Sequence, residues 1–141
     1  MIKYLILEEI EEIHEMMLER YGGLPGILDK NLLESSVEHP KMIFSGKELY
    51  RSIYDKAAAY LFHITRNHPF IDGNKRTAAV AAIIFLKGND IWICFQKEEL
   101  EEIVVDVAKG LVEKEELAFF FEFGKRPNQD AELSSLATLQ Q

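Results

Sequence analysis

Residues 68–89 read HPFIDGNKRTAAVAAIIFLKGN. The second half of this stretch, residues 78–86, is apolar on every side of a helix, and a helix of that kind has to be buried among others. Gly88 and Asn89 follow, and they are typical of a helix end. We therefore expect a helix over residues 77–87 at the centre of an all-α, compact helical bundle.

The first half of the stretch carries charges that fold stability alone would not select. Asn74 can cap the central helix, which places Lys75 and Arg76 in its first turn. The helix macrodipole is positive there, so both cations are unfavourable unless an anion binds. The free backbone N–H groups of this turn, with Gly73 allowing close approach, form an anion cradle that the two cations complete. The sequence predicts a phosphate site at this helix start.

Asp72 and His68 flank the predicted phosphate site. A carboxylate beside a phosphate would repel it unless it also held Mg²⁺, so Asp72 implies a metal ion. His68 precedes Pro69, which biases it towards extended backbone at the junction of helix and loop. Its imidazole suits a general base that removes a proton from an attacking hydroxyl. Together these residues predict transfer of a phosphate-containing group to a hydroxyl.

The rest of the chain reads as further amphipathic helices in a single domain. Apolar residues recur at helical spacing over about residues 6–21, 29–38, 49–67, 100–111 and 113–123. Residues 91–95 read as a short strand or extended segment, with Cys94 expected in the core. We expect one domain over residues 1–123 and a flexible C-terminal tail over residues 124–141.

Composition limits the possible partners. The net charge of -8 repels nucleic acid backbones and anionic membrane surfaces, so neither is an expected partner. The longest apolar block has nine residues, far below the roughly 20 that span a bilayer. One cysteine excludes an internal disulfide, and the first residues lack the layout of a signal peptide. We expect a cytoplasmic protein.

Residues 68–78 resemble the signature of the Fic/Doc superfamily, in its Doc (death-on-curing) branch. The resemblance extends to residues 20–26, 32–35 and 67, and covers roughly residues 4–123. It implies an all-helical fold with His68 as the base and Asp72 as the Mg²⁺ ligand. It also implies phosphate binding by Asn74, Lys75 and Arg76.

Two positions bear on which group is transferred. Family members that transfer AMP have glycine where this chain has Lys75, and a second arginine where it has Ala79. In the Doc branch, a bulky cation at the first position goes with transfer of the terminal phosphate. The resemblance thus implies a Mg²⁺- and ATP-dependent protein kinase, with protein adenylylation as the alternative.

The same resemblance implies a biological setting and a docking element. Doc-like proteins act as toxins on a translation elongation factor and are neutralised by a small antitoxin. Residues 22–28 contain three glycines and a proline, and they read either as an ordinary interhelical loop or as the family's flap, which can align a target peptide by backbone pairing. The expected docking residues are Gly22, Gly23, Leu24, Gly26 and Ile27.

Other chemistries fit the sequence less well. Glu11 and His14 have the Glu-x-x-His spacing of a carboxylate-bridged bundle metal site, but that site needs a second copy, and a solvated acidic helix face explains the glutamates. The Walker phosphate-loop and His-Glu-x-x-His zinc motifs are absent. A binding module that kept the fold and lost its chemistry is the remaining alternative, and the complete motif argues against it.

Overall fold

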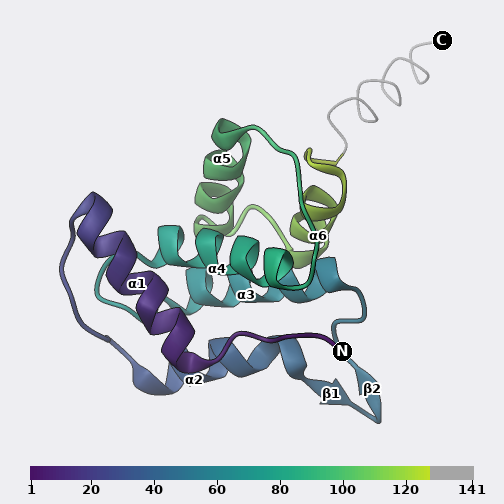
Figure 1. Ribbon diagram of the computed structural model, residues 1–141, viewed down its shortest axis with the longest axis horizontal. Helices are drawn as coiled ribbons and strands as arrows, with labels where there is room; N and C mark the ends of the chain where they lie inside the picture. The colour runs from purple at the N-terminus through teal and green to yellow at the C-terminus, as the bar shows by residue number, and fades with distance from the viewer. Residues whose placement is uncertain (128–141) are drawn as a thin grey trace.

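The computed structural model describes residues 1–127 of the chain and shows a helical bundle with one small hairpin (Figure 1). The elements are α1 (Leu7–Tyr21), α2 (Lys30–Glu38), the 3₁₀ turn η1 (His39–Lys41), β1 (Ile43–Phe44), β2 (Lys47–Glu48), α3 (Ile53–Asn67), α4 (Asn74–Gly88), α5 (Lys97–Ala108) and α6 (Lys114–Phe123). The predicted all-α fold is confirmed.

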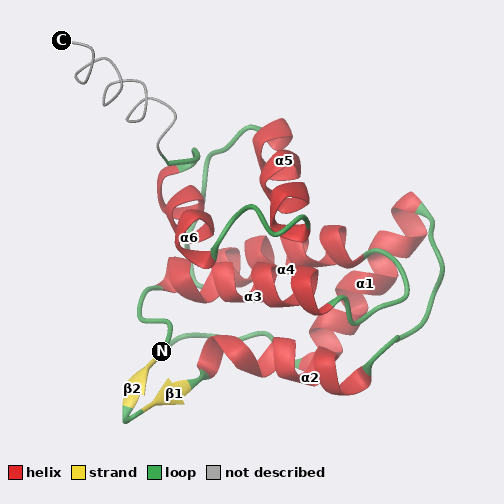
Figure 2. Cartoon of the chain, turned by 180° about the vertical axis from the view of Figure 1, so that it is seen from behind, coloured by secondary structure: helices red, strands yellow, loops and turns green. Residues whose placement is uncertain are grey.

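The antiparallel pair α3 and α4 forms the centre of the bundle (Figure 2). As predicted, no residue from 77 to 86 is exposed, although Ala79, Val80, Ile83 and Ile84 are only half-buried. Helix α3 shares the central position because it contacts α2, α5 and α6 as well as α4. The loop over residues 68–73 joins the pair at the end where α4 also packs against α1. The expected active-site motif therefore lies where three elements meet.

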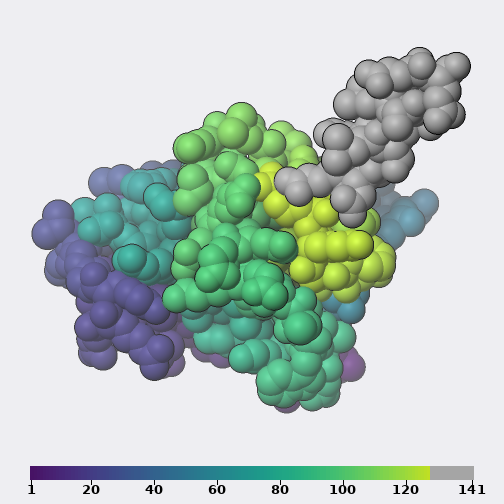
Figure 3. All heavy atoms as spheres, turned by 90° about the horizontal axis from the view of Figure 1, so that it is seen from above, coloured from purple at the N-terminus to yellow at the C-terminus, as the bar shows by residue number. Residues whose placement is uncertain are grey.

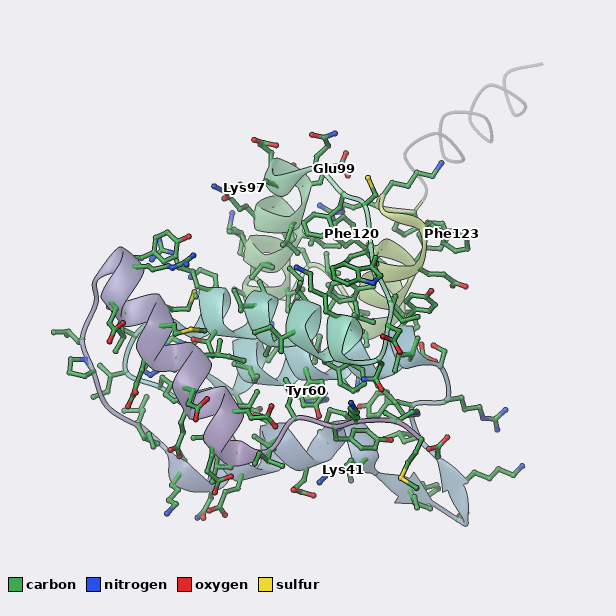
Figure 4. The ribbon with its side chains drawn as sticks, in the orientation of Figure 1. Lys41, Tyr60, Lys97, Glu99, Phe120 and Phe123 are labelled. Carbon is green, nitrogen blue, oxygen red and sulfur yellow. The ribbon has the colours of Figure 1, made fainter. Side chains whose placement is uncertain are left out.

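The N-terminal segment is tied to the core before α1 begins. Tyr60 of α3 is completely buried, and its hydroxyl accepts a hydrogen bond of 2.9 Å from the Leu5 backbone N–H (Figure 4). Asn89 brackets Lys3 by accepting from its N–H at 2.8 Å and donating to its carbonyl at 3.0 Å. These contacts fix the start of α1, on which one wall of the site depends.

Seen from above, α5 (green) and α6 (yellow) lie in the middle and to the right of the upper face, with the purple N-terminal part of the chain to the left (Figure 3). On α6, Phe120 is buried, whereas Phe123 lies on the outer side (Figure 4). Beyond α6, Arg126 pairs with Asp106 of α5 at 2.7 Å. Residues 128–141, most of the predicted tail, lie outside the described residues, so the flexible tail stays a prediction.

Helix α3, which follows the hairpin β1–β2, begins later than predicted. The spacing of apolar residues predicts helix from Leu49, but that residue is exposed and α3 begins at Ile53. Ser52 caps α3 by accepting from the Asp55 N–H at 2.9 Å, and Asp55 returns a bond to the Ser52 N–H at 3.2 Å. This reciprocal capping box defines the helix start more strongly than apolar spacing.

The segment after α4 is extended but pairs with no strand among the described residues. Its side chains alternate, with Ile91, Ile93 and Phe95 half-buried and Trp92 and Cys94 exposed. The prediction that Cys94 lies in the core was wrong, because an extended chain turns every second residue outward.

Leu111 was expected within the helix that became α5, but α5 ends at Ala108 and Leu111 is exposed. Across residues 1–127, no helix has the length and apolar character needed to cross a membrane.

Candidate active site

His68 ends α3 in an uncommon backbone conformation. It has φ 50° and ψ 54°, and its N–H donates to the Ile64 carbonyl at 3.2 Å. The extended geometry predicted from Pro69 was wrong, since the left-handed conformation also avoids the helical region that a following proline disfavours and closes the helix in addition. Residues other than glycine rarely adopt this conformation. The His68 side chain is exposed at the mouth of the loop.

Asn74 clamps the loop and does not cap α4. Its Oδ1 accepts from the Phe70 N–H, and its Nδ2 donates to the Phe70 carbonyl, both at 2.9 Å. The N-cap is Gly73, whose φ of 78° lies in the region that favours glycine. The predicted capping role of Asn74 was wrong because its buried side chain is fully engaged by Phe70.

Asp72 presents an exposed carboxylate that is kept ionised. Its Oδ2 accepts from the Leu24 N–H at 3.2 Å, and its Oδ1 accepts from the Gly73 N–H at 2.9 Å. These two hydrogen bonds lower the pKa of Asp72, and the nearby Arg76 and His14 lower it further. An ionised oxygen ligand of this kind suits a hard cation such as Mg²⁺.

Lys75 and Arg76 lie in the first turn of α4, as predicted, and both are exposed. The Arg76 guanidinium is 4.3 Å from the centre of the Tyr21 ring, which is a cation–π distance. Among the ion pairs of residues 1–127, neither cation has a carboxylate partner within 4.0 Å. Two cations are therefore available to an anion at the positive end of the helix.

The segment over residues 22–29 lies against the motif loop. The Leu28 N–H donates to the Pro69 carbonyl at 2.7 Å, and the Ile71 N–H donates to the Gly26 carbonyl at 3.0 Å. Ile27 forms an antiparallel bridge with Phe70. The structure thus brings four of the five predicted flap residues beside the motif, namely Gly23, Leu24, Gly26 and Ile27, with Leu24 and Ile27 exposed. A Cβ on the fifth, Gly22, would meet nothing within 4 Å.

His14 of α1 also belongs to the site, and the sequence reasoning did not assign it there. It is buried, its Nε2 lies 2.8 Å from the Asp72 carbonyl oxygen, and its ring stacks on Phe70 with centroids 3.7 Å apart and planes at 7°. Its position on the same helix face as Ile10, Ile13 and Met17 was the available signal. The described residues contain no group of three or more His, Cys, Asp or Glu side chains that could hold a metal ion.

The sequence of the chain is similar to those of known proteins. Residues 4–86 match the model of the Fic/DOC family. The chain is 32% identical to the protein kinase doc of Escherichia phage P1 over 109 residues, which cover 77% of this chain and 85% of that protein. It is 38% identical over 90 residues to the toxin Doc of Mycolicibacterium smegmatis, covering 62% of this chain and 69% of that protein.

Proposed function

This chain belongs to the Fic/DOC family, and from that premise we propose that it is a protein kinase that transfers the terminal phosphate of ATP to a hydroxyl of a target protein. One relative is named as a protein kinase and another as a toxin. The single observation that carries the proposal is the start of α4. There an ionised Asp72 lies beside Lys75 and Arg76, two cations without a carboxylate partner among the described residues.

The donor set fits Mg²⁺ accompanied by a nucleotide. Mg²⁺ is usually held by one or two carboxylates together with substrate phosphates and water, so the single carboxylate of Asp72 is sufficient. Such an ion would neutralise charge on the phosphate oxygens of ATP. Lys75 and Arg76 would bind the remaining oxygens, together with the backbone N–H group of Asn74.

His68 supplies the base in the proposed reaction. Its imidazole accepts the proton of the target hydroxyl while that oxygen bonds to the terminal phosphorus of ATP. The bond from this phosphorus to the bridging oxygen breaks, and ADP leaves with the electron pair. Lys75 and Arg76 stabilise the charge that develops on the transferred group. Atoms and charge balance without a further reactant.

AMP transfer by the same motif is the second candidate, since the family includes adenylyltransferases. The α4 N-terminus could hold either end of the triphosphate. Lys75 is the residue expected to determine whether the terminal phosphate or AMP is transferred. Its bulk at the first turn of α4 restricts how the triphosphate can lie, which favours reaction at the terminal phosphorus.

We further propose the biological setting that the relatives suggest. The chain would be the toxin of a cytoplasmic toxin–antitoxin pair, with a translation elongation factor as its target and a small antitoxin as its inhibitor. The flap over residues 22–28 would align the target peptide by backbone pairing. The backbone of residues 26–28 already pairs with the motif loop, so a bound peptide would use the remaining edge.

Labelled ATP tests the proposed reaction. The purified chain is incubated with cell extract and ATP labelled at either the γ or the α phosphate, with Asp72→Asn as the control. The proposal expects γ label on a protein and no transfer by the control. Transfer of α label would indicate AMP transfer, and no transfer of either label would refute the proposed activity.

A further inference from the structure

We infer that His14 is a positioning residue for the proposed active site, holding the peptide between Asp72 and Gly73 in the orientation that metal and phosphate binding require. The inference rests on the proposed function for its catalytic meaning. The contact between the His14 Nε2 and the Asp72 carbonyl oxygen carries it.

The hydrogen bond has only one possible direction. A carbonyl oxygen has no proton to give, so the His14 Nε2 must carry the hydrogen and donate it at 2.8 Å. This defines the imidazole as protonated on Nε2. Because the ring is buried, the bond is shielded from competing water. The arrangement resembles the outer-shell donors that orient metal ligands in many proteins.

One peptide plane controls both halves of the proposed site. Fixing the Asp72 carbonyl also fixes the Gly73 N–H on the other side of the same planar peptide. That N–H donates to the Asp72 Oδ1 at 2.9 Å and so orients the carboxylate. Gly73 is also the N-cap of α4, where the anion-binding N–H groups begin. A single donor on α1 therefore aligns the metal ligand and the phosphate cradle.

The surroundings of His14 match this role. Its ring lies flat against Phe70, whose backbone is held by Asn74, so the imidazole is located by stacking as well as by its hydrogen bond. A Cβ placed on Gly73 would lie 3.6 Å from the His14 ring, which shows how closely the loop is seated on it. Neither contact is needed to bury α1, whose other core residues are aliphatic or Met.

Two substitutions separate the donor from the ring. His14→Phe keeps an aromatic ring for stacking on Phe70 but removes the N–H donor, whereas His14→Gln keeps an N–H donor and loses the stacking. Ile10→Ala is the control, since it removes buried volume from the same face of α1 one turn away. Thermal unfolding of each variant shows which effects follow general destabilisation.

The first readout is the hydrogen exchange of backbone amides in the metal-free protein. We expect the Gly73 amide to lose protection from hydrogen exchange in His14→Phe and to keep it in His14→Gln and Ile10→Ala. Equal protection of Gly73 in His14→Phe and the unmodified chain would overturn the inference, whatever the activity.

The second readout is the binding of Mn²⁺ with ATP, measured by electron paramagnetic resonance. Loss of an outer-shell donor typically weakens metal binding by about 10- to 100-fold, and we expect that loss in His14→Phe with recovery in His14→Gln. Equally weakened Mn²⁺ binding in Ile10→Ala would mean that His14 acts only as a core residue, and it would overturn the inference. The proposed function fails separately, if the unmodified chain transfers no phosphate.

Discussion

The Leu24 backbone N–H donates a hydrogen bond of 3.2 Å to the Asp72 Oδ2, across 48 positions of the chain. This contact joins the flap to the residue proposed to hold Mg²⁺. A second hydrogen bond, from the Ile71 N–H to the Gly26 carbonyl at 3.0 Å, joins the same two segments. The element proposed to dock the target and the element proposed to bind nucleotide are therefore one connected unit.

Gly23→Ala should disturb this unit. A Cβ at this position would lie 2.9 Å from the Asp72 Oδ2, and the Gly23 φ of 122° is one that alanine adopts only at a cost of about 1–3 kcal/mol. We expect roughly tenfold weaker Mg²⁺ activation of phosphate transfer.

Gly22→Ala is the matched control for Gly23→Ala. Gly22 also has a positive φ, of 79°, but a Cβ there meets nothing within 4 Å. Both variants should lose stability in thermal unfolding, and only Gly23→Ala should need more Mg²⁺ in the labelling assay. Equal Mg²⁺ requirements in the two variants would show that the flap does not influence metal binding by Asp72.

His68→Ala should lower the rate of phosphate transfer by about 10² to 10⁴, the usual contribution of a general base. The side chain is exposed, so thermal unfolding should change little apart from strain at its left-handed backbone. His68→Asn addresses that strain, because asparagine tolerates this conformation better than alanine. Both variants should be equally inactive, and unchanged activity in either would refute the assigned base.

Tyr21→Leu should weaken nucleotide binding by releasing Arg76. The guanidinium lies 4.3 Å from the Tyr21 ring centre, and such a contact at an exposed site contributes about 0.5–1 kcal/mol. That energy corresponds to an increase in KM for ATP of roughly two- to fivefold. Tyr21→Phe keeps the ring and should behave like the unmodified chain. An unchanged KM in Tyr21→Leu would show that Arg76 needs no such support.

Stability should fall on acidification because of a half-buried cluster of histidines around Tyr50. Burial lowers the pKa of His63 to about 3, with His39 and Lys114 adding to the effect, and burial also lowers the pKa of His39. The Tyr50 hydroxyl lies 2.8 Å from the His39 Nδ1 and 3.3 Å from the His63 Nε2. The folded protein therefore disfavours the protonated form of both imidazoles.

The sign of this effect follows from proton binding in the two states. Histidine in the unfolded chain has a pKa of about 6.5. Below that pH, the unfolded chain therefore binds more protons than the folded chain does. The contribution of neutral His63 to the free energy of unfolding is complete above pH 6.5 and is lost as the pH falls towards 3. One excluded proton lowers the unfolding free energy by up to about 1.4 kcal/mol per pH unit. Urea unfolding between pH 7.5 and 5.5 measures the slope, which should be shallower in His63→Gln; an identical slope would contradict the assignment.

Local sequence signals predicted most of the fold. The helix periodicity of α1, the Asp29 cap of α2 and the apolar run of α4 each appear in the structure close to the expected positions. The hairpin before α3 was missed because Ile43 and Phe44 are apolar yet exposed. Its signal was the two-residue turn at Ser45 and Gly46, which both have positive φ.

The site divides in the same way. The position of Lys75 and Arg76 in the first turn of α4, where the helix macrodipole is positive, could be predicted because local sequence signals where a helix starts. The role of His14 could not, since its contact with Asp72 spans 58 positions and exists only after α1 packs on α4. The contact of Asn74 with Phe70 spans only four positions, and it was missed because an asparagine at a helix start is more often read as a cap.

A crystal structure with Mg²⁺ and a non-hydrolysable ATP analogue tests the central claim most directly. The account predicts the triphosphate at the amino end of α4, in contact with Lys75 and Arg76, and the metal ion on the carboxylate of Asp72. Nucleotide bound at another place, with the start of α4 left empty at saturating ligand, would contradict it.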